Sequence, residues 1–140
     1  MGAFELTICL HVVTAILGVG QVTALVVVAN QGRKTSPVAP ATWAALKRLT
    51  RGTNWSLAVM LLSGVLLEYL DGWSHSHAWW LRIAFLLFVA CGAVLGMIQG
   101  ALRKGEAAGN DSALRGVAVR AWVVSALVAV IAVLMQLKPW

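Results

Sequence analysis

LTICLHVVTAILGVGQVTALVVVAN, residues 6–30, is the stretch that decides the fold, because it contains no Asp, Glu, Lys or Arg. A helix that crosses the hydrocarbon of a bilayer needs about 20 apolar residues. Inside lipid the backbone has to satisfy its own hydrogen bonds, and a continuous apolar run does so as a helix. Residues 6–30 are therefore predicted to form a transmembrane helix.

Three further apolar runs follow, at residues 53–70, 78–102 and 116–137. With residues 6–30 they use most of the chain, so residues 1–140 are predicted to form a single domain. The runs are too continuous for a β-barrel, whose strands are about ten residues long and alternate in polarity. The predicted fold class is all-α: a polytopic membrane protein with four transmembrane helices in an antiparallel, up-down bundle.

Composition also indicates a membrane protein. Hydrophobic residues make up 60% of the chain and charged residues only 11%, whereas a soluble domain is about half apolar and a quarter charged. The net charge of +6 does not indicate nucleic-acid binding, because the basic residues lie between apolar runs and no nucleic-acid motif is present. No basic residue precedes residues 6–30, which therefore differ from a cleavable signal peptide and are expected to stay in the protein.

The basic residues predict the orientation, since cytoplasmic loops are enriched in Lys and Arg. Nine of the 11 basic residues follow the first or the third apolar run. They are Arg33, Lys34, Lys47, Arg48, Arg51, Arg103, Lys104, Arg115 and Arg120. Both termini and residues 71–77 are accordingly predicted to lie outside the cytoplasm, which for a bacterial inner membrane means the periplasm.

The seven tryptophans fit this orientation as interfacial anchors. Those expected at the outer interface are Trp73, Trp79, Trp80 and Trp140, and those expected near the inner one are Trp43, Trp55 and Trp122. Residues 41–49 place aromatic and aliphatic side chains at near-helical spacing beside basic ones. They form either a short interfacial helix on an anionic leaflet or an extension of the second span into the cytoplasm.

A polar stripe marks the first span, where His11, Thr14 and Gln21 lie on one helix face. Lipid cannot satisfy polar groups, so this face is predicted to point into the bundle. Ser63 and Ser125 are matching polar residues of the second and fourth spans. Thr14, Gln21, Ser63 and Ser125 form either a hydrogen-bonded seam between helices or the lining of a pocket for a small molecule.

All three histidines are expected toward the outer side of the membrane, together with the acids Glu5, Glu68 and Asp71. Imidazole and carboxylate groups suit copper(II) or zinc, and a histidine inside a span suits an axial position on haem b. The candidate metal or haem ligands are His11, His75, His77, Glu68 and Asp71. In the alternative interpretation one of the acids pairs with Arg82, and His11 only packs between helices.

Glycines recur every fourth residue in the third span, at Gly92, Gly96 and Gly100, and so form one helix stripe. Small residues let two helices approach closely in lipid. The stripe is either an interface between copies of the protein or, in the favoured interpretation, a contact with a neighbouring span of the same chain.

Residues 10–20, LHVVTAILGVG, resemble the first helix of small bacterial integral membrane proteins of unknown function. Those proteins are similar in turn to the membrane domain of copper-resistance D proteins, in which an apolar helix opens with Leu-His and continues into small residues. The resemblance implies a four-helix protein of about this length, with His11 as the outer histidine and copper or haem as a ligand.

No enzyme is predicted, because no nucleophile adjoins a histidine and no span carries paired carboxylates. The leading hypothesis is a non-enzymatic accessory subunit, whose partners are the lipid bilayer and either copies of itself or a larger membrane complex. The two alternatives are a protein that binds copper or haem on its outer side, and a binder or permease for a small molecule of the quinone type.

Overall fold

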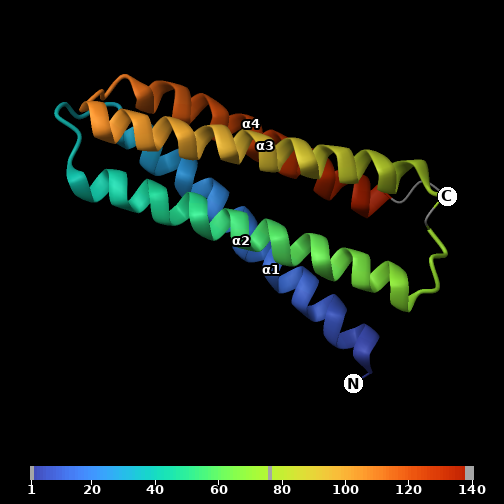
Figure 1. Ribbon diagram of the computed structural model, residues 1–140. Helices are drawn as coiled ribbons and strands as arrows, with labels where there is room; N and C mark the ends of the chain where they lie inside the picture. Colours follow the sequence, from blue (N-terminus) through green and yellow to red (C-terminus); the bar gives the residue numbers. More distant parts are fainter. Residues whose placement is uncertain (1, 76, 138–140) are drawn as a thin grey trace.

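The computed structural model describes residues 2–75 and 77–137, which form four helices and their connections (Figure 1). The helices are α1 (Ala3–Gly32), α2 (Pro40–Leu70), α3 (Trp79–Ala108) and α4 (Ala113–Leu137). Each one is long and apolar enough to cross a membrane. The prediction of an all-helical protein with four candidate spans is therefore confirmed.

Local signals explain where the helices begin and end. Pro40 occupies the first turn of α2. A backbone N–H group in the first turn has no acceptor within the helix, so proline costs no hydrogen bond there. Gly109 ends α3 in the left-handed conformation, with φ of 58°. Every helix is longer than the apolar run that predicted it, because helical structure continues into the polar residues that flank each run.

The largest extension is at the start of α2. Residues 41–49 belong to the same continuous helix as the second span, so the interfacial-helix interpretation is wrong. Trp43 and Leu46 are 5% and 0% exposed, so they pack inside the bundle. The predicted role of Trp43 as an interfacial anchor is wrong for the same reason. The extension also meets the end of α3, where Lys47 Nζ lies 2.7 Å from Glu106 Oε2.

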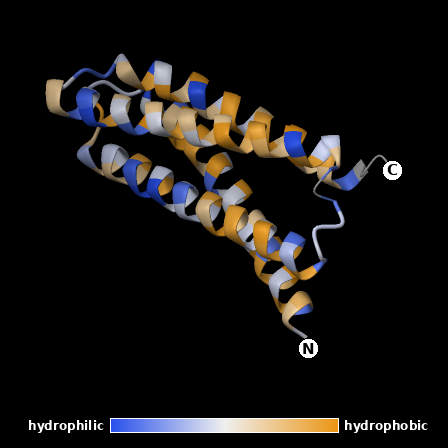
Figure 2. Ribbon diagram, turned by 45° about the vertical axis from the view of Figure 1, so that its right-hand side comes forward, coloured by the Kyte–Doolittle hydropathy of each residue, from blue (hydrophilic) through white to orange (hydrophobic). Residues whose placement is uncertain are grey.

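The connecting segments define two ends of the bundle (Figure 1). Residues 33–39 and 109–112 lie together at one end, which we call the basic end, and Ser36 Oγ donates a 3.0 Å hydrogen bond to Asp111 Oδ2 there. Residues 71–75 and 77–78 lie at the opposite end, which we call the histidine end. Figure 2 shows apolar residues along all four helices, with hydrophilic residues gathered in the first half of α2.

The shared hydrophobic core lies in the half of the bundle toward the basic end. Each helix contributes a leucine that is 0% exposed: Leu25, Leu46, Leu102 and Leu114. Among the described residues this cluster does not continue to the histidine end, where the hairpin α1–α2 diverges from the hairpin α3–α4 (Figure 1). The four helices therefore close against one another at one end only.

The outward faces of the helices are apolar too. Leu62, Ile16 and Leu86 are 69%, 66% and 65% exposed, and a helix that is hydrophobic all round is typical of a membrane span. Several threonine hydroxyl groups on α1 and α2 find partners within their own helix. Thr14 and Thr53, for example, each donate a hydrogen bond to the carbonyl four residues earlier, so that neither hydroxyl needs water.

Candidate functional site

A cleft of about 850 Å³ lies between the two hairpins at the histidine end. We call it the His11 cleft, because the His11 imidazole is among the few polar groups that line it. Its walls are mainly aliphatic and aromatic side chains from all four helices, including Ile8, Met60, Phe85, Phe88 and Met135. Volume and composition are those of a small-molecule site, which is typically 300–1,000 Å³ and mostly apolar with few polar groups.

His11 reaches the cleft from the third turn of α1 and is held by α2. Its Nδ1 lies 2.8 Å from Ser63 Oγ, and Ser63 is 3% exposed. The imidazole also lies against α2 at Gly64, where an added Cβ would be 3.5 Å from His11 Cε1. The hydrogen bond to Ser63 and the contact at Gly64 thus hold the His11 imidazole against α2.

The hydrogen bonds of Ser63 favour one position for the ring proton of His11. A serine hydroxyl has one proton to donate, and Ser63 Oγ donates it to the Met60 carbonyl at 3.1 Å. In this arrangement Ser63 Oγ accepts a hydrogen bond from His11, which places the proton of the neutral imidazole on Nδ1. Nε2 is then left with a free lone pair, which can accept a hydrogen bond or bind a metal.

Polar groups gather where the cleft reaches the histidine end. His75 Nδ1 lies 3.2 Å from Asp71 Oδ2 and 3.8 Å from Glu68 Oε2, and the His75 backbone N–H donates to Glu68 Oε1 at 2.8 Å. The His75 ring also packs against Trp80, with centroids 6.0 Å apart. Glu68, Asp71 and His75 thus form a polar cluster at the outer edge of the apolar cleft, which we call the rim.

The structure brings together only part of the predicted metal or haem site. Glu68, Asp71 and His75 meet at the rim, and His11 lines the same cleft, whereas His77 is exposed. Within residues 2–75 and 77–137, no three His, Cys, Asp or Glu side chains are arranged to hold a metal ion. The alternative pairing with Arg82 is also not found there, since the rim acids face His75.

The predicted polar seam is divided between two separate contacts. Ser63 bonds His11 near the cleft, and Gln21 Oε1 accepts a 3.2 Å hydrogen bond from Ser56 toward the middle of the bundle. Thr14 is buried and bonds its own helix, while Ser125 is half-buried on α4. None of Thr14, Gln21, Ser63 and Ser125 lines the His11 cleft. The apolar walls of the His11 cleft were not predicted, because apolar side chains in a span form no recognisable motif.

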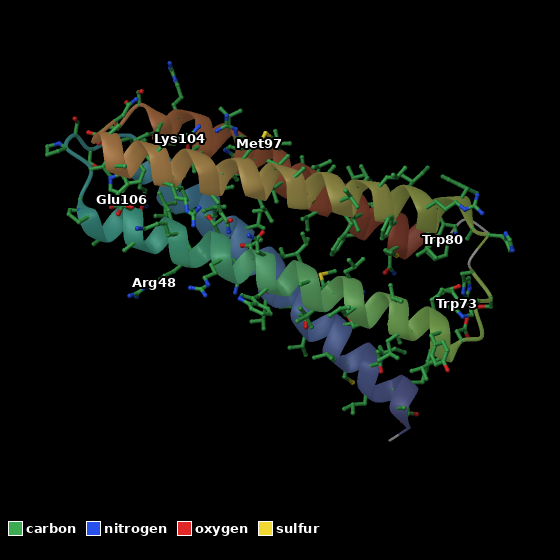
Figure 3. The ribbon with its side chains drawn as sticks, viewed as in Figure 1. Arg48, Trp73, Trp80, Met97, Lys104 and Glu106 are labelled. Atoms are coloured by element: carbon green, nitrogen blue, oxygen red, sulfur yellow. The ribbon has the colours of Figure 1, made fainter. Side chains whose placement is uncertain are left out.

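The glycine stripe is turned largely away from the other spans. An added Cβ at Gly92 would lie 3.6 Å from Leu57, but at Gly96 and Gly100 it would meet no described atom within 4 Å. Met97, beside this stripe, is 53% exposed and points outward (Figure 3). A contact with another span of the same chain is therefore present at Gly92 alone.

These features define the class of protein: a four-helix bundle suited to a membrane, closed at its basic end and open at its histidine end. Comparisons with known protein families, with curated proteins and with solved structures give no match.

Proposed function

We propose that the chain spans a bacterial inner membrane as an antiparallel, up-down bundle, with the basic end in the cytoplasm and both termini in the periplasm. The positive-inside rule supports this orientation, since nine of the 11 basic residues belong to segments at or near the basic end. Figure 3 supports it as well: Arg48 and Lys104 lie toward the basic end, and Trp73 and Trp80 lie at the histidine end.

Cysteine labelling tests the orientation. In a chain with Cys9→Ala and Cys91→Ala, we expect Ser74→Cys to react with a membrane-impermeant maleimide in intact spheroplasts, because Ser74 is exposed at the histidine end. Ser112→Cys, exposed at the basic end, should react only after the membrane is permeabilised. A shift in gel mobility reports labelling of either variant. Labelling of Ser112→Cys, but not of Ser74→Cys, in intact spheroplasts would show that the topology is the reverse of the one proposed.

The function that the geometry supports best is binding of a lipophilic small molecule in the His11 cleft. The observation that carries this proposal is an apolar cleft of about 850 Å³ lined by an imidazole with a free acceptor nitrogen. The apolar walls suit the ring or chain of a membrane-soluble molecule, and His11 Nε2 suits a hydroxyl group on it. A membrane quinol has both features.

Haem b is the second candidate, because the same nitrogen could bind iron. Histidines that bind metals almost always donate their other ring N–H to a neighbouring acceptor, and Ser63 accepts such a bond from His11. His11 would be the only axial ligand from a span. Haem, when bound, would supply redox or gas-binding chemistry, while the apolar walls would exclude water.

Analysis of the purified protein distinguishes these ligands. After solubilisation in a mild detergent, we expect an organic extract of the protein to contain a quinone in near-equimolar amount, identified by chromatography and mass spectrometry. A visible absorption spectrum with the bands of a haem would instead favour the second candidate. A colourless protein whose extract contains phospholipid only would contradict both, since acyl chains alone would then fill the cleft.

The accessory-subunit hypothesis stays a prediction, and one observation favours it. The open surface at Gly96 and Gly100 would let a helix of another subunit, or of a second copy, approach α3 closely. Binding of a small molecule and docking on a partner use different faces of the protein, so that one does not exclude the other.

A further inference from the structure

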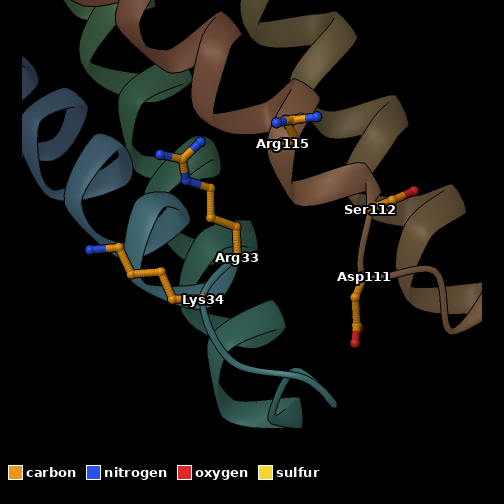
Figure 4. A pocket seen from close by; sticks show the side chains of 5 residues that line it. All are labelled: Arg33, Lys34, Asp111, Ser112 and Arg115. Atoms are coloured by element: carbon orange, nitrogen blue, oxygen red, sulfur yellow. The ribbon is translucent and has the colours of Figure 1, made fainter.

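A second cavity, of about 530 Å³, lies at the basic end. The residues that line it are Arg33, Lys34, Asp111, Ser112 and Arg115 (Figure 4). Three of these five side chains are cationic, and they come from two parts of the chain. Arg33 and Lys34 directly follow α1, whereas Arg115 lies in the first turn of α4.

The carboxylate in this cavity, Asp111, is already engaged in joining two loops. It accepts hydrogen bonds from Ser36 Oγ at 3.0 Å and from the Val38 backbone N–H at 3.4 Å, and Val38 is itself buried. Figure 4 shows the Asp111 carboxylate pointing away from the guanidinium groups of Arg33 and Arg115. The loop contact thus places the cations around one cavity without pairing them with an acid.

None of the three cations has an anionic partner in the part of the chain that the structure describes, where no salt bridge involves Arg33, Lys34 or Arg115. Glu106, an acid of the same end, pairs with Lys47 instead. Cations held around one cavity repel one another, and an anion between them removes that repulsion. Guanidinium groups can bind a phosphate through paired hydrogen bonds, and a lysine adds a point charge.

We propose that Arg33, Lys34 and Arg115 form a binding site for a phosphate group. In the proposed membrane position this group belongs to an anionic phospholipid, because Arg33 lies just beyond the apolar residues 6–30 and Arg115 just before the apolar residues 116–137. Both side chains then lie at headgroup depth. A soluble phosphate compound has the same binding chemistry. The site is independent of the His11 cleft, since no residue lines both cavities.

The test measures phosphatidylglycerol binding to the detergent-purified protein by native mass spectrometry. The variant Arg33→Gln/Arg115→Gln is expected to bind the lipid roughly thirtyfold more weakly, because the phosphate loses two guanidinium groups that line the cavity, each contributing about 1 kcal/mol. The variant Arg33→Lys/Arg115→Lys keeps the charge and is expected to lose less than about tenfold. The matched control, Arg103→Gln/Lys104→Gln, removes two exposed charges from α3 outside the cavity and should change binding by less than about threefold.

Competition identifies the source of the phosphate. If millimolar inorganic phosphate displaces the bound lipid, the site takes soluble phosphate compounds; if it does not, the site is specific for a lipid headgroup. Equal weakening in the cavity variant and the control variant would overturn the proposal, because the lipid would then respond only to total charge. Unchanged binding by Arg33→Gln/Arg115→Gln would overturn it as well. Thermal melting of each variant in detergent verifies that it is folded.

Discussion

Valine in place of Gly105 is expected to prevent the four helices from closing at the basic end. A Cβ atom at Gly105 would lie 2.7 Å from the Cβ of Ala113 and 3.0 Å from the ring of Trp43. The Ala113 atom is fixed by the backbone of α4, and the Trp43 ring is buried, so neither can move without displacing a helix. Overpacking by extra methyl groups typically costs about 1–3 kcal/mol, and valine adds two more carbons to the one that already clashes.

The measurement is the melting temperature of the variant in detergent, followed by size-exclusion chromatography after heating. Gly105→Ala should melt well below the unchanged protein, and Gly105→Val should yield little or no monodisperse protein. Gly100→Val is the matched control on the same helix, because an added Cβ there meets no described atom within 4 Å. If Gly105→Val and Gly100→Val had the same melting temperature, the close packing of the basic end would be contradicted.

The same control examines the outward glycine stripe. If Gly100→Val keeps the melting temperature of the monomer but changes the elution volume of an oligomer, then the stripe is an interface between copies of the protein. This outcome would leave the argument on Gly105 intact, because the two glycines face different surroundings.

Hydropathy was enough to predict the number and the positions of the helices. A span has to be apolar over its whole crossing, whatever it packs against. The sequence of each helix therefore shows by itself that the helix can be a span. The start of α2 was the exception. Residues 41–49 carry Trp43 and two basic residues, Lys47 and Arg48. This pattern suits a helix on the membrane surface as well as a helical extension, and only contacts with the core distinguish the two.

The site was predictable only in part, for a geometric reason. Helical periodicity placed His11 on an inward face, and Ser63 on the facing span was named as a partner for a polar seam. Periodicity does not give the angle between two hairpins, however, and that angle opens the His11 cleft. It depends on bulky side chains such as Leu102 and Leu114, which fill the basic end, and on close contacts such as the one at Gly105.

The second large effect is expected at His11. In the variant His11→Leu the cleft keeps its apolar walls but loses the acceptor nitrogen, so a quinol would lose its one hydrogen bond to an imidazole. A short-tailed ubiquinol analogue should bind at least about tenfold more weakly, the consequence of leaving a hydroxyl unpaired in an apolar site. Quenching of tryptophan fluorescence measures this binding, because Trp73 and Trp80 line the cleft.

Ser63 provides the sharper test, since it does not line the cleft and would act only through His11. In Ser63→Ala the imidazole loses the acceptor that keeps its proton on Nδ1, so that Nε2 carries the proton in part of the molecules and cannot accept from the ligand. Affinity for the quinol should fall by about fivefold, the value of one hydrogen bond of about 1 kcal/mol. Thr14→Val is the control, because the Thr14 hydroxyl bonds the Leu10 carbonyl of its own helix. If Ser63→Ala binds the analogue as tightly as Thr14→Val does, the tautomer of His11 has no part in recognition, and the cleft selects its ligand by shape and polarity alone.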